Sequence, residues 1–488
     1  MKTRAQLLPE EIKADNDGMV LDPRYADEIE DAHRAVDWGA LAAAGYDKTG
    51  DYCFIYSYPP VRTLQPIPST QMFEPSPWEP HAETINMYLH IPYCSGICSY
   101  CYFAKVVDTG RGPVPKAQYI PLLIWEIEDK LQRYGGDPEI QTIHFGGGTP
   151  SILEIDQIEQ IMSYLSSLNL SLDAEITFEC APETIYRNLD KLKVLRDNGV
   201  NRINVGVENL DDRVLKLMAR RHGSDVTIGA IENVRRVGFD NVNVDLIYAL
   251  PGQSLASWVE TLKTVCSWGL ESVSVYRLRK HPMKRISKLE ERLYPAYTDG
   301  LKMQLAHSIV MQAAGYLRVQ SHKYASAREK MQRQTERKRG ITSTQLLSAG
   351  CGAYGFLNST FYWNTKSLAK WGERVRRHEH PTWIGETLER DELMRKSMVL
   401  GVHTSSGIDR VAFTTKFRAD PKEVFESEIT EAVGLGLFTV DERAIRPTEL
   451  GYFFGDELSV KFYSPRVRAV LDKLGMKYGM FFEQDRYA

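Results

Sequence analysis

The chain has 488 residues, of which 43% are hydrophobic and 25% are charged, and its formal net charge is −4. These values are ordinary for a globular enzyme, and the near balance of 60 basic and 64 acidic residues gives no reason to expect nucleic acid as a partner. The sequence shows no apolar run of about 20 residues and no apolar leader, so we expect no membrane span, no secretory signal and a cytoplasmic location.

Residues 1–84 are expected to form an N-terminal extension. A helical pattern covers 28–44, and a proline-rich passage follows at 58–80, where seven of the 23 prolines fall. Proline removes a backbone donor and fixes φ, so this passage predicts an irregular segment without strands or long helices. We expect it to lie over an active site.

From residue 85 a regular alternation begins. Six short runs rich in β-branched and aromatic residues are separated by amphipathic stretches of helical length; the runs are 85–91, 141–145, 174–180, 202–207, 241–250 and 272–278. Such alternation predicts βαβ units and a parallel sheet. Six units predict an α/β fold, a partial, open (β/α)6 TIM-like barrel over 85–379, with its chemistry at the carboxyl ends of the strands.

The rest of the chain is less regular. A basic segment at 328–339 precedes a glycine-rich stretch at 350–355, whose alternatives are a ligand-binding strand end and a tight turn. Short helical patterns from about 385 onward predict a small helical C-terminal domain over 380–488 with a two-stranded wing.

Three of the seven cysteines fall within eight positions, as Cys94-Ser-Gly-Ile-Cys98-Ser-Tyr-Cys101 directly after the first predicted strand. An odd total argues against a disulfide framework, and clustered thiols indicate a metal site. Three soft thiolates on one loop suit a [4Fe–4S] cluster with one iron left open. The alternative is a structural zinc site, which normally needs a fourth protein ligand from a second pair that the sequence lacks.

This motif, after Tyr-Leu-His-Ile-Pro-Tyr, resembles the radical S-adenosylmethionine (SAM) superfamily, and in particular the HemN-like branch around oxygen-independent coproporphyrinogen III oxidase. The resemblance covers about residues 85–460. It implies that Cys94, Cys98 and Cys101 hold a [4Fe–4S] cluster that reductively cleaves SAM to a 5′-deoxyadenosyl radical.

The resemblance also assigns cofactor contacts. It places the SAM amino group at a glycine-rich strand end, the ribose at Glu179 and Asp245, the carboxylate at Arg220 and the cluster near Tyr88. A fixed guanidinium suits a carboxylate, and three glycines allow close approach of the backbone. The strand end is Gly146, Gly147, Gly148 and Thr149.

Two positions depart from the porphyrinogen oxidases: Phe103 stands where they have a fourth cysteine, and Glu208 where they have glutamine. With the long extension, these departures resemble the methylase and cyclopropanase members of the branch. That resemblance implies a second SAM near Phe103, Arg279 and 350–355, which donates a methylene group to an sp2 carbon of a natural product.

Several other side chains are ambiguous from sequence. Cys351 is interpreted as a buried, inert thiol, and His90 and His144 as structural histidines. Three aromatic residues could line a substrate pocket or pack in the core; these are Tyr362, Trp363 and Trp371.

Three functions therefore stay open. The first is methylation or cyclopropanation of a conjugated small molecule; the second is a coproporphyrinogen oxidase or another tetrapyrrole- or heme-processing enzyme; the third is a non-catalytic heme chaperone. The expected partners are the small-molecule substrate and an electron donor such as flavodoxin or ferredoxin.

Overall fold

A computed structural model describes residues 19–48, 52–79, 81–280, 284–339 and 345–480. At its centre is a curved sheet whose strand order is β1-β15-β14-β13-β12-β2-β5-β6-β7-β8-β9-β11-β10. Six consecutive members are parallel and confirm the predicted units: β2 (Thr84–Ile91), β5 (Glu139–Gly147), β6 (Leu170–Cys180), β7 (Arg202–Glu208), β8 (Val242–Tyr248) and β9 (Ser272–Arg277).

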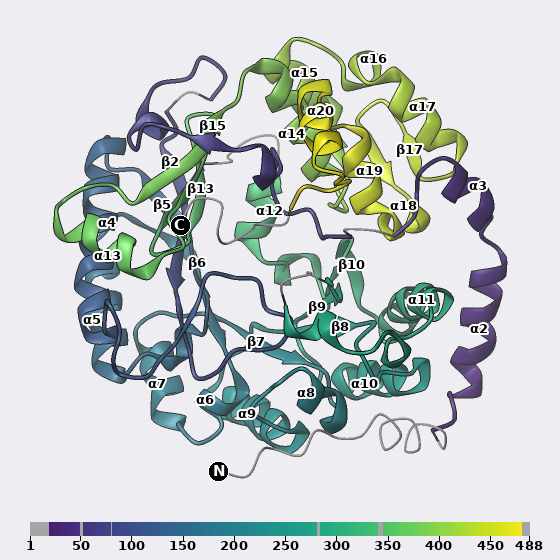
Figure 1. Ribbon diagram of the computed structural model, residues 1–488, viewed down its shortest axis with the longest axis horizontal. Helices are drawn as coiled ribbons and strands as arrows, with labels where there is room; N and C mark the ends of the chain where they lie inside the picture. Colours follow the sequence, from purple (N-terminus) through teal and green to yellow (C-terminus); the bar gives the residue numbers. More distant parts are fainter. Residues whose placement is uncertain (1–18, 49–51, 80, 281–283, 340–344, 481–488) are drawn as a thin grey trace.

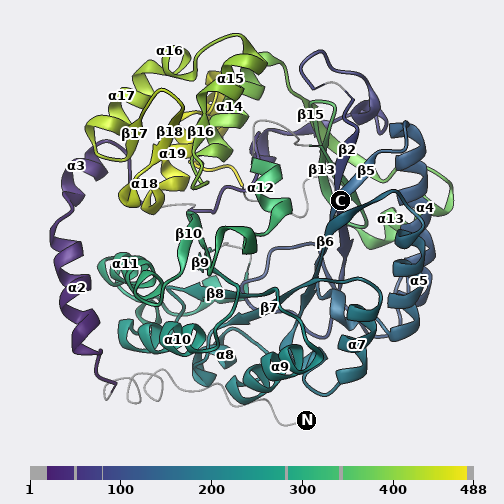
Figure 2. The ribbon, with the colours of Figure 1, turned by 180° about the vertical axis from the view of Figure 1, so that it is seen from behind.

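Helices cover the outside of these strands (Figures 1 and 2). They bury one apolar face each against the sheet, as for Ile158, Ile161 and Leu165 of α5. The covering helices are α4 (Lys116–Tyr134), α5 (Ile155–Ser166), α6 (Pro182–Ile185), α7 (Leu189–Asp197), α8 (Asp212–Leu217), α9 (Ser224–Val237), α10 (Leu255–Ser267) and α11 (Tyr297–Ala313).

The sheet continues past the predicted barrel on both edges. At one edge β12 (Leu346–Ala349) runs parallel to β2, followed by antiparallel β13 (Tyr354–Leu357), β14 (Thr360–Asn364), β15 (Thr382–Thr387) and β1 (Gln65–Pro66). At the other edge lie β11 (Lys323–Ala325) and β10 (Leu317–Gln320). The sheet thus ends at residue 387, beyond the predicted boundary at 379, because β15 pairs with β14.

The C-terminal region is helical, as predicted, but its small sheet has three strands, since β16 (Ile408–Asp409) pairs with the hairpin β17 (Phe438–Val440) and β18 (Ala444–Pro447). Its helices are α14 (Arg390–Gly401), α15 (Arg410–Phe417), α16 (Pro421–Val424), α17 (Glu426–Gly434), α18 (Glu449–Phe453), α19 (Gly455–Lys461) and α20 (Pro465–Lys473).

The N-terminal extension is built into the rest of the molecule. Helix α2 (Pro23–Arg34) packs on α11, and α3 (Trp38–Ala43) follows it at the rim of the C-terminal region (Figure 1). Leu41, Tyr46 and Ile55 share one hydrophobic core with Phe454 and Leu458 of the C-terminal region. The extension therefore joins the barrel to the C-terminal domain.

The remaining elements are short. They are β3 (Tyr93–Cys94), β4 (Val106–Val107), α12 (Arg333–Arg339), α13 (Leu368–Arg376) and the 3-10 turns η1 (Val61–Thr63), η2 (Gln71–Phe73), η3 (Pro150–Ile152), η4 (Arg285–Lys288), η5 (Glu291–Leu293) and η6 (Arg328–Lys330). Helix α12 lies inside the ring of strands in both views (Figures 1 and 2). No helix among the described residues is long and apolar enough to cross a membrane.

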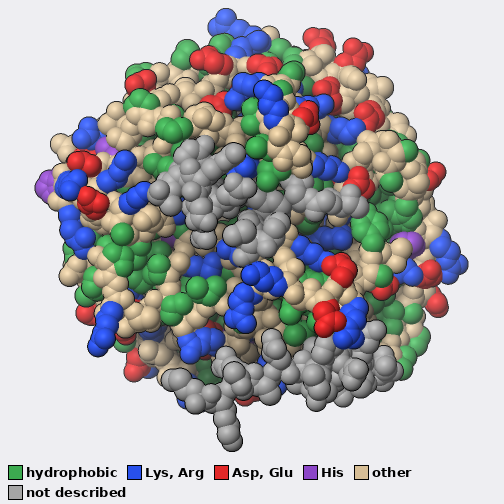
Figure 3. Space-filling model, viewed as in Figure 1, with side chains coloured by type: hydrophobic (Ala, Val, Ile, Leu, Met, Phe, Trp, Pro, Cys, Tyr) green, Lys and Arg blue, Asp and Glu red, His purple; other side chains and the backbone are tan. Residues whose placement is uncertain are grey.

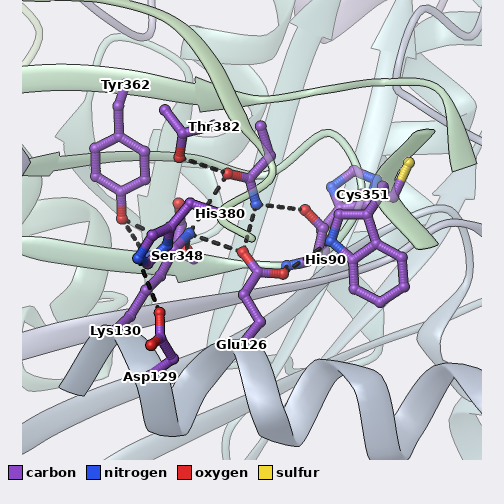
Figure 4. A network of polar contacts seen from close by, with 12 residues as sticks. His90, Glu126, Asp129, Lys130, Ser348, Cys351, Tyr362, His380 and Thr382 are labelled. Atoms are coloured by element: carbon purple, nitrogen blue, oxygen red, sulfur yellow. Dashed lines mark hydrogen bonds and ion pairs between the residues drawn. The ribbon is translucent and has the colours of Figure 1, made fainter. Parts of the chain in front are cut away.

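A buried polar network ties α4 to strands β12 and β14 (Figure 4). Lys130 Nζ lies 2.8 Å from Glu126 Oε1, both side chains are fully buried, and Asn364 Nδ2 donates to the same oxygen at 2.6 Å. Lys130 also donates to the carbonyl of Ser348 at 2.7 Å, and Trp371 Nε1 donates to Glu126 Oε2 at 2.8 Å. The network satisfies two buried charges and holds the strand that extends the barrel.

Charged side chains of both signs are mixed over the face of the molecule shown in Figure 3, in keeping with the small net charge.

Candidate active site

The carboxyl ends of the six parallel strands open into one cavity of about 400 Å³. Parallel strands present their carboxyl ends on the same rim, so residues from distant parts of the chain meet there. All three motif cysteines, Tyr88, Phe103, Gly147, Gly148, Thr149, Glu179, Glu208, Arg220 and Asp245 line this cavity. Gly146 is the one predicted site residue outside the lining; it lies one position earlier on β5.

The cysteine loop is held by its neighbours on the rim. Thr149 Oγ1 lies 3.5 Å from Cys94 Sγ, and Arg220 Nη1 lies 3.5 Å from Cys98 Sγ. Lys105 Nζ donates to the carbonyl of Cys101 at 2.9 Å, and the backbone N–H of Ser99 donates to the carbonyl of Met218. Burial raises the pKa of the Cys94 thiol to about 11, which disfavours its thiolate unless a metal centre binds it.

The three motif cysteines share one loop at the rim of the cavity. Over the described ranges, no group of three or more His, Cys, Asp or Glu side chains is placed to hold one metal ion. By their chemistry, three soft thiolates on one loop fit a cubane cluster, in which each would bind a different iron. None of the seven cysteines forms a disulfide bond.

The glycine strand end is required by packing within the protein itself. Gly147 has φ of 111°, and a Cβ there would lie 2.6 Å from the His90 ring. A Cβ on Gly148 would lie 2.6 Å from the carbonyl oxygen of Tyr93. The glycines therefore let β5 approach the end of β2 and the start of the cysteine loop, and this leaves their backbone at the cavity wall.

Glu179 is oriented by a histidine. His144 Nε2 lies 2.8 Å from Glu179 Oε1, and the Gln332 amide contacts His144 Nδ1 at 2.9 Å. These contacts fit a neutral imidazole whose Nε2–H donates to the carboxylate while Nδ1 accepts from the amide. His144 is thus a positioning residue, and Lys323 Nζ extends the chain by donating to Gln332 Oε1 at 2.9 Å.

Arg220 and Glu208 form a pair in the cavity wall. Glu208 Oε1 lies 3.6 Å from Arg220 Nη1, and Arg220 Nη2 donates to the carbonyl of Gly206. Burial raises the pKa of Glu208 to about 7, against the opposing effect of Arg220. Glu208 has φ of 64°, which is uncommon for a residue with a Cβ and is typical of functional sites. Arg220 Nε is buried without a hydrogen-bond partner in the described structure, so part of the guanidinium is available to a carboxylate.

Asp245 and Tyr88 complete the strand ends. Asn243 Nδ2 donates to Asp245 Oδ1 at 3.0 Å, and burial raises the pKa of Asp245, opposed by Lys323. The Tyr88 ring stacks on His144 with a centroid distance of 5.8 Å, and its hydroxyl lies 3.0 Å from His90 Nδ1.

His90 has a structural role, as predicted. Its Nε2 contacts the carbonyl of Ala104 at 2.8 Å, and Nδ1 faces the Tyr88 hydroxyl. Burial lowers its pKa to about 4. The neutral ring therefore connects β2 to the end of the cysteine loop.

Of residues 350–355, only Tyr354 lines the cavity. The stretch as a whole is therefore not a second ligand-binding strand end. A Cβ on Gly350 would lie 2.4 Å from the carbonyl oxygen of His90, and the Cys351 thiol is buried. This favours the tight-turn alternative. Three aromatic residues considered for the pocket pack in the core: Tyr362, Trp363 and Trp371.

Sequence reasoning missed the side of the cavity formed by residues 52–58, which we call the bridging segment. Phe54 packs on His322 of the β10–β11 turn with a centroid distance of 4.1 Å, and Tyr56 packs on Tyr354 of β13 at 5.6 Å. The segment therefore spans from one edge of the open barrel to the other. None of the described residues of the proline-rich passage at 58–80, which was expected to lie over the site, lines the cavity; Phe54 and Tyr56 of the bridging segment, which no motif marks, do so.

Cations stand beside these rings. Arg277 and Arg279, at the end of β9, and Lys323 on β11 line the cavity. Arg279 lies over the Tyr102 ring at 4.3 Å, and Arg277 Nη1 is buried without a hydrogen-bond partner in the described structure. Arg279 was already expected near a second cofactor. The position of Arg277 at the end of a predicted strand could have indicated it, whereas no sequence signal marks Lys323.

Comparisons with known proteins agree with this site. Residues 88–265 match the model of the radical SAM superfamily, and residues 388–454 match that of the HemN C-terminal domain. The chain is 27% identical to the heme chaperone HemW of Bacillus subtilis over 382 residues, covering 76% of this chain and 97% of the relative. It is 26% identical to the oxygen-independent coproporphyrinogen III oxidase of Escherichia coli, covering 85% and 93%.

A solved structure, that of the coproporphyrinogen III oxidase HemN of Escherichia coli, has the same fold, with a TM-score of 0.73 at 24% identity over 88% of this chain and 99% of the other. The protein is a radical SAM enzyme, for which a [4Fe–4S] cluster and SAM are the cofactors. Within the superfamily, the chain belongs to the HemN branch, since a HemN C-terminal domain follows its barrel.

Proposed function

We propose that this enzyme directs radical chemistry at a tetrapyrrole, that is, at a flat, conjugated substrate that carries carboxylates. The observation that carries the proposal is the side of the cavity formed by the bridging segment, the end of β9 and β11, which we call the bridging side. Arg277, Arg279 and Lys323 lie there beside aromatic rings. Guanidinium groups suit carboxylates, and aromatic faces suit a conjugated ring system. The names of the HemW and coproporphyrinogen oxidase relatives support the same substrate class.

In this proposal, the two sides of the cavity have different functions. Cys94, Cys98 and Cys101 would hold the cluster, and the strand ends would bind SAM through Gly147, Gly148, Glu179, Arg220 and Asp245. The bound cofactors supply a 5′-deoxyadenosyl radical. Arg277 and its neighbours orient the substrate, while Phe54 and Tyr56 cover it and exclude water. Reductive cleavage of SAM would depend on an external reductant. We also propose that the protein acts in the cytosol.

The experiment compares possible substrates under one condition. Reconstituted enzyme is incubated anaerobically with SAM, dithionite and either hemin, coproporphyrinogen III or no substrate. We expect one tetrapyrrole to raise 5′-deoxyadenosine formation about tenfold or more above the background and to be consumed, since productive binding places the reacting groups together. Binding of heme without any 5′-deoxyadenosine would support the chaperone function instead.

A second candidate is methylation or cyclopropanation with a methylene group from a second SAM. Phe103 favours it: this residue occupies the position of the fourth cysteine, is 46% exposed and stacks on Tyr102 at 4.7 Å beside the cysteine loop. An aromatic side chain there could cover a second cofactor. SAM labelled with a CD3 group separates the candidates, because methylene transfer would place deuterium in 5′-deoxyadenosine and form S-adenosylhomocysteine in equal amounts.

A further inference from the structure

The basic segment at 328–339, which has no part in the proposed function, lies inside the molecule. It forms η6 and α12, and α12 is surrounded by the strands of the sheet (Figures 1 and 2). Gln332, Gln334 and Thr335 of this segment line the cavity. Gln332 is only 4% exposed, so its side-chain amide needs hydrogen-bond partners within the protein.

Contacts with two strands fix this segment in place. The Arg333 N–H donates to Glu175 Oε1 on β6 at 3.1 Å, and Arg333 Nη1 lies 2.7 Å from Asp173 Oδ2 on the same strand. Gln334 Nε2 donates to the carbonyl of Met87 on β2 at 2.5 Å. The segment is therefore anchored on the inner face of the sheet.

Both ends of the Gln332 side-chain amide are engaged. Its Oε1 accepts from Lys323 Nζ at 2.9 Å and from Thr335 Oγ1 at 2.7 Å. Because an ammonium group can only donate, the amide oxygen faces Lys323, and the amide nitrogen then donates to His144 Nδ1 at 2.9 Å. The proton of His144 therefore lies on Nε2, which donates to Glu179 Oε1 at 2.8 Å. One chain of hydrogen bonds thus joins the bridging side to the strand end that carries Glu179.

Gly146 leaves space for the last contact of this chain. A Cβ at Gly146 would lie 2.9 Å from Glu179 Oε1 and 3.1 Å from His144 Nε2. Gly146 itself does not line the cavity, so the contact between the two side chains is what requires a glycine there. The backbone of β5 is therefore matched to the His144–Glu179 pair.

We propose that Gln332 is a positioning residue that couples substrate binding to SAM binding. The inference rests on the proposed function, in which the bridging side binds the carboxylates of the substrate and Glu179 binds SAM. A substrate carboxylate bound to Lys323 fixes the ammonium group, and through it the Gln332 amide and the His144–Glu179 pair. SAM then meets a Glu179 carboxylate that is already oriented, so its binding orders fewer groups. By linkage, SAM raises the affinity for the substrate by the same factor.

The test measures SAM affinity in the oxidised holoenzyme, which binds SAM without cleaving it. Dissociation constants are determined for SAM, 2′-deoxy-SAM and 3′-deoxy-SAM, each without and with saturating hemin or coproporphyrinogen III. Gln332→Met removes the amide at nearly constant length, and Lys323→Met removes the cation but leaves the amide. Glu336→Gln, on an exposed position of α12 outside the cavity lining, is the control. Iron content shows that each variant keeps its cluster.

In the wild type we expect the tetrapyrrole to lower the Kd of SAM about fivefold, and loss of a ribose hydroxyl to raise it about tenfold. Gln332→Met should abolish the tetrapyrrole effect and reduce the ribose effect to about threefold or less, because Glu179 loses its fixed orientation. Lys323→Met should abolish the tetrapyrrole effect and keep most of the ribose effect. Glu336→Gln should match the wild type in both measurements.

An equal loss of affinity for SAM and both analogues in Gln332→Met would overturn the proposal, because a purely structural defect does not distinguish the ribose hydroxyls. A tetrapyrrole effect of wild-type size in that variant would overturn it as well, and so would the absence of any effect in a wild type that binds the tetrapyrrole. Equal affinity of the wild type for SAM and both analogues would instead contradict the SAM site of the proposed function. Failure of the wild type to bind either tetrapyrrole would contradict its substrate class, while the ribose measurement would still test Gln332.

Discussion

The two sides of the cavity differ in how the chain builds them. The strand-end side, formed by the ends of β2 and β5–β8 with the cysteine loop, comes from short motifs, each next to its own strand. The bridging side combines residues 52–58 with the end of β9, the β10–β11 hairpin and Tyr354. In our proposal, the first side binds the cofactors, whereas the second, which is assembled from distant segments, binds the substrate.

The largest effect is expected from removing a thiol of the cysteine loop, compared with removing a thiol elsewhere in the chain. Cys98→Ala should abolish cluster binding and SAM cleavage, because the remaining two thiolates cannot hold the cluster with its open iron. Iron content and electron paramagnetic resonance of the reduced protein measure this. Cys266→Ala, which removes a thiol on α10 outside the cavity, is the matched control and should keep both properties.

A second change tests the cofactor contacts with the cluster left in place. Arg220→Met should lower SAM cleavage about 100-fold or more, since a charge-assisted contact to the SAM carboxylate and the contact with Cys98 are lost together. The iron content should stay near that of the wild type. Unchanged cleavage in this variant would remove Arg220 from the SAM site.

The bridging side is tested by a variant that should separate substrate binding from SAM cleavage. Arg277→Gln should raise KM for the tetrapyrrole about tenfold, because a charge-assisted hydrogen bond is replaced by a neutral one. Cleavage of SAM in the absence of substrate should be unaffected. A fall in both would make Arg277 part of the cofactor site.

A smaller change in KM is expected from a substitution in the bridging segment. Tyr56→Leu removes an aromatic face against Tyr354 and should raise KM by about threefold, in line with roughly 0.5–1 kcal/mol for an aromatic pair. Trp268→Leu, on the outer side of the barrel, is a control that should leave KM unchanged. Equal KM values for wild type and Tyr56→Leu would show that the bridging segment does not touch substrate.

The pH dependence of stability provides the mildest test. The folded pKa of His90 is about 4, below its ordinary value of 6.5, because burial disfavours the charged ring. The unfolded chain therefore gains a proton first as pH falls, and His90 should remove about 2 kcal/mol of stability between pH 6.5 and 5. Denaturant unfolding of the wild type and His90→Asn measures it; identical pH slopes would contradict the assignment.

The strand-end side could be predicted almost completely from the sequence, and the bridging side could not. Glu179 and Asp245 sit on strands whose ends must share a rim, so the parallel sheet places them together once the strands are recognised. Phe54 and Tyr56 carry no motif, and their position depends on a core that the extension shares with the C-terminal domain. The same limit explains the missed strands: β13, β14 and β15 form because neighbouring antiparallel segments pair, which periodicity alone does not reveal.

The most direct test of the account is tetrapyrrole-dependent formation of 5′-deoxyadenosine, measured for wild type and Arg277→Gln with the same SAM and dithionite. The account predicts that a tetrapyrrole stimulates the wild type about tenfold or more, that methyl esterification of its carboxylates abolishes the stimulation, and that Arg277→Gln needs a higher tetrapyrrole concentration. If no tetrapyrrole changes the rate in the wild type, or if the esters stimulate as well as the free acids, the assignment of the bridging side is wrong.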